Sequence, residues 1–71
     1  MSEAVKIWLL AMFGTELEEI EQNIKNYNLW LLGCNNPDEV PAYEEALEEF
    51  AEYKEILTNC IKQVEEGTFN V

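Results

Sequence analysis

The 71-residue sequence contains no histidine and no arginine, and Asp38 is its single aspartate. Without histidine, neither Ser2 nor a cysteine has the usual general base for nucleophilic catalysis. A zinc site would also lack ligands, because the two cysteines are far apart in the chain. We therefore expect no catalytic residues, no metal site and no cofactor, and we predict that the protein is not an enzyme.

Cysteine is scarce as well, with Cys34 and Cys60 the two thiols. The first residues show no basic start followed by a small-residue cleavage site, so we expect no secretory leader. Two cysteines without a leader indicate free thiols in a reducing compartment, which predicts a cytoplasmic location. The apolar segment 4–13 is about half the length of a membrane span, so no membrane association is expected.

Basic residues are few: the chain has four lysines and 15 acidic residues, which gives a net charge of −11. Nucleic acid and anionic membranes repel such a chain, whereas a basic protein surface attracts it. Hydrophobic residues make up 48% of the sequence and are interleaved with the acids, which indicates a folded domain. The expected partner is another protein with a basic groove, and direct binding to nucleic acid is not expected.

The pattern predicts an all-α fold, because no two segments form a convincing pair of strands. We expect one domain over residues 1–71, with three helices at about 3–13, 16–32 and 41–66. Ser2 can cap the first helix. Gly14 interrupts it, and Thr15 with Glu18 three residues later has the form of a capping box. Whether the first two helices continue through Gly14 is left open.

Two of these helices carry apolar residues at heptad spacing, which gives each helix one apolar stripe. The segment 34–41 between them has the chemistry of a turn, and Gly33 and Gly67 are natural stops. Helices joined by so short a loop form an antiparallel hairpin. The short apolar N-terminal helix is expected to pack on this hairpin. The stripe residues are Leu17, Ile20, Ile24, Tyr27 and Leu31, and then Tyr43, Leu47, Phe50, Leu57, Ile61 and Val64.

The N-terminal segment is apolar nearly all the way round, and a helix of that kind is expected to be buried. A chain of this length has little surface with which to cover it. The prediction is an interface with a second copy in a two-fold dimer, or with a pocket of another protein. An ordinary exposed patch is the alternative. The candidate apolar binding residues are Ile7, Trp8, Leu10, Met12, Phe13 and Trp30.

The third predicted helix carries glutamates on the side opposite its apolar stripe. They can form a solvated face that keeps the protein soluble, or a surface that enters a basic groove. Carboxylates on successive helical turns lie roughly 5–6 Å apart, close to the phosphate spacing of a nucleic-acid strand, so acidic mimicry is one version of that use. The candidate acidic binding residues are Glu44, Glu45, Glu48, Glu49, Glu52 and Glu55.

Two overlapping segments that begin at Glu44 and Glu48 both read EExxE. This pattern resembles the magnesium-binding motif of the helical MazG-type nucleotide pyrophosphatases, and the resemblance implies magnesium-dependent hydrolysis of nucleoside triphosphates. The second acidic motif of that family, on a following helix, is missing here. A MazG-like enzyme is therefore a minor alternative.

Taken together, these patterns predict a small acidic helical protein-binding module, dimeric, that inhibits or regulates a larger protein. Its length, its charge and its lack of arginine and histidine resemble, in general character, small phage- or mobile-element-encoded inhibitors. Such proteins antagonise host defence enzymes or nucleic-acid-binding proteins. No motif carries this resemblance. The alternative from a different class is a purely structural oligomerisation module.

Overall fold

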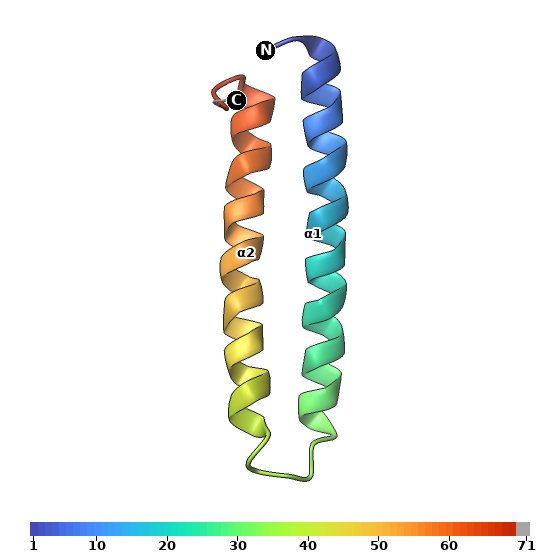
Figure 1. Ribbon diagram of the computed structural model, residues 1–71, viewed down its shortest axis with the longest axis vertical. Coiled ribbons are helices and arrows are strands. Elements are labelled where there is room, and N and C mark those ends of the chain that lie inside the picture. Colours follow the sequence, from blue (N-terminus) through green and yellow to red (C-terminus); the bar gives the residue numbers. More distant parts are fainter. Residues whose placement is uncertain (70–71) are drawn as a thin grey trace.

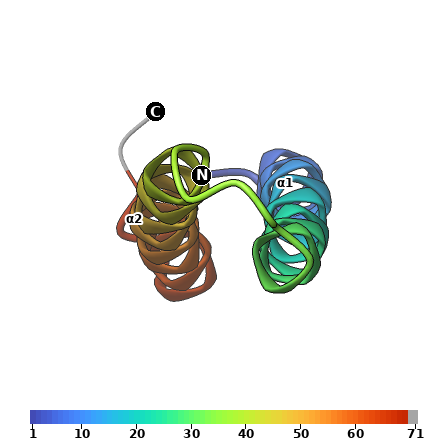
Figure 2. The ribbon, with the colours of Figure 1, turned by 90° about the horizontal axis from the view of Figure 1, so that it is seen from below.

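The computed structural model describes residues 1–69, which form two long antiparallel helices and no strand (Figure 1). Helix α1 spans Glu3–Leu32 and helix α2 spans Val40–Glu66. They lie side by side in a single layer (Figure 2), and the molecule measures 51 × 15 × 13 Å. The all-α class and the helical hairpin are confirmed, whereas the predicted three-helix arrangement is wrong.

Helix α1 passes through Gly14 without a break, so the helices predicted at 3–13 and 16–32 are one element. A glycine inside a helix costs only about 1 kcal/mol relative to alanine, which strong neighbouring helix formers and packing can outweigh. Thr15 does not cap the start of a helix, because it lies inside α1. Its hydroxyl donates to the Ala11 carbonyl oxygen (3.0 Å), so this side chain is satisfied inside a continuing helix.

The apolar N-terminal segment therefore lengthens the hairpin and does not fold across its open side. Leu9, on the inner side of α1, is 5% exposed. One turn further on, the ring of Phe13 meets the ring of Phe69 edge to face at 5.7 Å. Segment 4–13 is thus paired along one side with the C-terminal end of α2 and with Phe69, and the other described residues do not cover its remaining sides.

Local hydrogen bonds cap the start of α1 and the end of α2. The Ser2 side chain accepts a hydrogen bond from the Val5 N–H (3.2 Å). Helix α2 ends at Gly67, whose φ of 75° is the left-handed conformation that glycine favours, and the Thr68 N–H donates to the Gln63 carbonyl (2.9 Å). In the loop, the Asn36 side chain accepts from the Asp38 N–H (3.0 Å), a turn that the sequence predicts.

The seam between the helices is thin. Among the described residues, only Leu9 and Val64 are buried, and the other inward-facing side chains are half-buried. Tyr27 is the centre of an aromatic cluster in the half of the hairpin nearer the loop. Its ring lies 5.1 Å from Trp30, 6.0 Å from Tyr43 and 5.1 Å from Phe50. Because Tyr27 contacts both Tyr43 and Phe50, it lies at a height between them, close to that of Leu47.

Replacing Gly14 by alanine is expected to raise the free energy of unfolding by about 0.5–1 kcal/mol. A Cβ added at Gly14 would meet no atom within 4 Å, and the residue is already helical. Chemical denaturation of the native chain and the variant would measure this. Gly67→Ala is the control with the opposite sign, because its φ of 75° strains any residue that has a Cβ. Destabilisation by Gly14→Ala would contradict the unbroken helix.

Candidate functional site

The six apolar candidates do not form one patch. Ile7 and Trp8 are 62% and 63% exposed, and Trp30 is 53% exposed. Leu10 and Phe13 are half-buried, and Phe13 packs on the C-terminal segment, so these two belong largely to the seam. The remaining candidate, Met12, is exposed. The exposed candidates fall on different sides of α1, because consecutive helical positions point about 100° apart.

One broad side of the hairpin, which we call the Tyr53 face, carries exposed apolar residues from both helices together with polar ones. Glu16 of α1 borders the same hollow as Tyr53 and Ile56 of α2, which fixes the side on which these three lie. Positions three, four or seven residues apart share a helix face. By that spacing the Tyr53 face includes Val5, Trp8, Met12, Glu16, Glu19, Asn23, Asn26 and Trp30 of α1, and Ala42, Ala46, Glu49, Tyr53, Ile56 and Cys60 of α2.

The opposite side, the Lys54 face, is marked by an ion pair across the seam. Lys54 Nζ lies 3.8 Å from Glu21 Oε1, and both side chains are about half exposed, so the pair contributes little to stability. Ile7 lies fourteen residues before Glu21 and Leu32 eleven residues after it, both at helical repeats that place them on this face. Ile7 and Trp8, although adjacent in sequence, therefore lie on different faces of the hairpin.

The described part of the hairpin has open hollows along its surface. A hollow of about 350 Å³, the middle hollow, lies halfway along the Tyr53 face and is almost entirely apolar. Its lining residues are Glu16, Ile20, Phe50, Tyr53, Ile56 and Leu57. A second hollow of about 470 Å³ lies at the loop, between Trp30 and Tyr43, and its lining includes the polar residues Asn35, Asn36 and Glu39. Both are open to solvent, so they suit large side chains of another protein.

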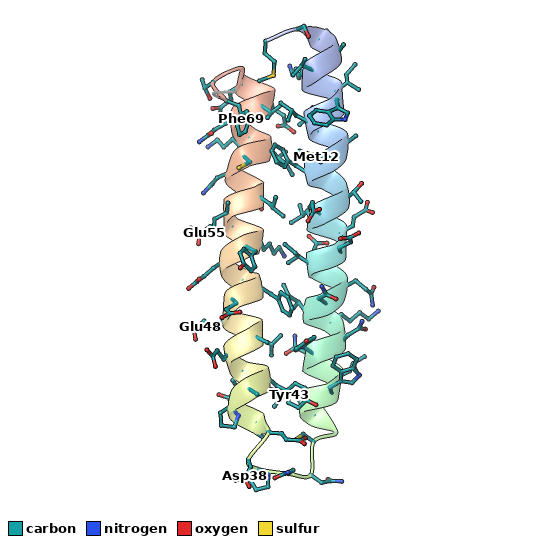
Figure 3. The ribbon with its side chains drawn as sticks, in the orientation of Figure 1. Met12, Asp38, Tyr43, Glu48, Glu55 and Phe69 are labelled. Atoms are coloured by element: carbon teal, nitrogen blue, oxygen red, sulfur yellow. The ribbon has the colours of Figure 1, made fainter. Side chains whose placement is uncertain are left out.

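The six acidic candidates lie on the outer side of α2, and all are exposed. Figure 3 shows Glu48 and Glu55 turned away from α1, whereas Tyr43 points toward it. The sequence prediction of an acidic stripe opposite the apolar seam therefore fits the geometry. Glu49 lies at the edge where this acidic stripe meets the Tyr53 face. The stripe is Glu44, Glu45, Glu48, Glu49, Glu52 and Glu55.

Both cysteines are free and half-buried. The Cys34 thiol lies in the loop, 3.3 Å from the carbonyl oxygen of Asn36 and 3.8 Å from a carboxylate oxygen of Glu39. Cys60 lies on the Tyr53 face. Within residues 1–69, no three histidine, cysteine, aspartate or glutamate side chains come together in a way that could hold a metal ion.

Comparison with known protein families, with curated proteins and with solved structures finds no match to this chain. The two faces and the acidic stripe are therefore the basis for a functional proposal. In the part of the chain that the structure describes, neither helix has a stretch long and apolar enough to cross a membrane.

Two exposed residues of α2, Tyr53 (55%) and Ile56 (57%), were missed as interaction candidates. A signal for them exists in the sequence. Beside the seam stripe, α2 carries a second stripe at heptad spacing, formed by Ala42, Ala46, Glu49, Tyr53, Ile56 and Cys60. Two adjacent stripes on one helix are typical of a bundle in which each helix has two neighbours. Leu29 and Leu32 were also missed, and both are exposed near the loop.

Proposed function

We propose that this chain is a small acidic protein-binding module of the cytoplasm that self-associates as a dimer and inhibits or regulates a larger protein. One observation carries the proposal. The hairpin buries only Leu9 and Val64 among its described residues, while it exposes large apolar side chains on both of its broad faces. Exposed apolar surface on this scale in a small soluble chain is typical of protein–protein interaction sites.

The acidic stripe supports a regulatory partner with a basic groove. Its glutamates lie on one exposed side of a straight helix, within reach of a groove that could accept that helix. Charged groups at the rim of an interface mainly raise the association rate and select the partner, whereas buried apolar side chains supply most of the affinity. In this proposal the stripe steers the encounter, and exposed apolar residues near the loop, such as Leu32, complete the contact.

The test starts from an affinity pull-down in the native host, followed by binding measurements with the recovered protein. Reversing four charges of the stripe, Glu45→Lys, Glu48→Lys, Glu52→Lys and Glu55→Lys, is expected to abolish binding while circular dichroism still reports a helical chain. Glu49 is left unchanged because it borders the Tyr53 face. Binding by the native chain should also weaken steeply as salt is added.

The matched control reverses four glutamates outside the stripe: Glu3, Glu18, Glu65 and Glu66. It makes the same change in net charge and is expected to retain most of the binding. Equal loss in both variants, or binding that is insensitive to salt, would contradict a role for the stripe. If the chain assembles and no partner is recovered, the structural oligomerisation module is the better description, and Trp8→Ala should then weaken assembly.

A further inference from the structure

Among the described residues, the Tyr53 face carries exposed apolar side chains from both helices: Val5, Trp8, Met12 and Trp30 of α1, and Tyr53 and Ile56 of α2. We infer that it is the surface on which a second copy of this chain docks, forming a four-helix bundle. The two-fold axis of this bundle runs parallel to the long axis of the hairpin, so both loops lie at the same end. This inference rests on the proposed self-association. It adds the face on which the two copies meet, the residues that pair across the interface and the direction of the two-fold axis.

The burial pattern favours a second copy as the occupant. Both helices bring apolar residues to this face: α1 brings Trp8, Met12 and Trp30 toward its two ends, and α2 brings Tyr53 and Ile56 in its middle. Covering all of them takes two partner helices of matching length. A second hairpin supplies both. The Tyr53 face is also continuous with the seam, because Ile20, Phe50 and Leu57 of the seam line the middle hollow. Covering that hollow would complete burial of side chains that the single hairpin leaves half-buried.

The heights at which residues of α1 and α2 lie along the hairpin favour one orientation of the dimer's two-fold axis. An axis parallel to the helices places α1 of one copy against α2 of the other at equal height. Counting along the helices from Tyr27, which lies between Tyr43 and Phe50, Trp30 is at a height between Ala42 and Ala46, and Asn26 is at a height between Ala46 and Glu49. In the dimer, the largest side chain on this face would thus lie against one of the smallest. The Asn26 amide could donate to the Glu49 carboxylate of the second copy.

An axis perpendicular to the helices would pair α1 with α1 and α2 with α2. For the two copies to overlap along their full length, this axis must pass near the middle of α1. The stripe residues at that level are Glu16 and Glu19, so carboxylates of the two copies would face one another. In the parallel-axis dimer, Glu19 lies at the height of Tyr53 and Ile56 of the second copy instead, and its carboxylate can extend to solvent from the rim of the face.

The distribution of charge between the two helices also favours a two-fold axis parallel to them. Helix α2 carries eight glutamates and two lysines, whereas α1 carries five glutamates and two lysines. A perpendicular axis would place the two more acidic helices side by side. A parallel axis puts them at diagonal corners, each flanked by two α1 helices, and directs the two acidic stripes outward on opposite sides of the bundle. Like charges are thereby kept as far apart as the bundle allows.

Analytical ultracentrifugation of Ile56→Asp and Ile7→Asp tests which face is used. The two isoleucines have similar exposures, 57% and 62%, and lie on the Tyr53 face and the Lys54 face respectively. We expect Ile56→Asp to halve the particle mass and Ile7→Asp to leave the dimer intact. A dimer that survives Ile56→Asp and dissociates with Ile7→Asp would overturn the choice of face. A native chain that is monomeric at every concentration would overturn the self-association itself.

The distance between the two loops tests the orientation. Spin labels on the native Cys34 report it in a Cys60→Ala chain, and ultracentrifugation first checks that this chain is still a dimer, because Cys60 lies on the Tyr53 face. Labels within roughly 30 Å are expected, because neighbouring helix axes in a bundle lie about 8–10 Å apart. A distance that approaches the 51 Å length of the molecule would show the loops at opposite ends. That result would overturn the parallel axis while leaving dimerisation, and the proposed function, standing.

Discussion

Replacing Tyr27 by alanine is expected to lower the free energy of unfolding by about 3 kcal/mol, one of the two largest effects that we expect from a single truncation. The ring contacts three other aromatic rings, those of Trp30, Tyr43 and Phe50, at centroid distances of 5.1, 6.0 and 5.1 Å. A domain of this size has a stability of only roughly 4–10 kcal/mol, so the loss would leave much of the population unfolded on mild heating.

Urea denaturation followed by circular dichroism measures this effect, with all variants at one protein concentration because self-association contributes to stability. Tyr27→Phe is the matched control. It keeps the ring and all three aromatic contacts, and we expect it to remain within about 0.5 kcal/mol of the native chain. Should Tyr27→Phe cost as much as Tyr27→Ala, the hydroxyl and not the ring packing would be the source of the stability.

The second large effect concerns Leu9, for which alanine is expected to cost about 2–4 kcal/mol. Its side chain is 5% exposed, and it is the one buried residue of α1. Removing three carbons there leaves a cavity in a seam that has few other buried side chains. The loss should appear in urea denaturation, and hydrogen exchange should show faster opening of α1 amides near the N-terminus than in the half nearer the loop.

Ile7→Ala is the control for this prediction, since it removes a side chain of the same size two residues earlier. Ile7 is 62% exposed on the Lys54 face, and we expect its truncation to change stability by less than about 0.5 kcal/mol. Similar losses for Ile7→Ala and Leu9→Ala would mean that the N-terminal segment is buried on both sides in solution. The Lys54 face would then also be an interface.

The hairpin could be predicted from the sequence because its signals agree with one another. The heptad positions of Tyr27 and Phe50 face each other, and Gly33 and Pro41 bracket the loop as the turn chemistry indicates. The predicted helix break at Gly14 was wrong because it gave the low helix propensity of one glycine more weight than the apolar stripe that runs through it. Leu10, Phe13 and Leu17 continue one helical stripe across it, and tertiary packing of that stripe outweighs the weak helix propensity of one glycine.

The candidate site was only partly predictable for a different reason. An apolar run indicates that a segment is buried, but it does not show which side of the segment packs against its own chain. Trp8 and Phe13 look alike in the sequence, yet the structure turns Phe13 onto Phe69 and leaves Trp8 63% exposed. The acidic stripe could be placed because its residues lie opposite a seam that the sequence already defines.

The position of the loop has a consequence for how this chain reaches its folded state. Contacts near the loop join residues close in sequence, and those at the other end join the two ends of the chain. Closing a short loop costs less entropy than closing a long one, so pairing should begin beside the loop and proceed outward like a zipper. The aromatic cluster is placed where such pairing starts. Leu9 and Val64 lie toward the far end, where the last turns close and where the hairpin should open first.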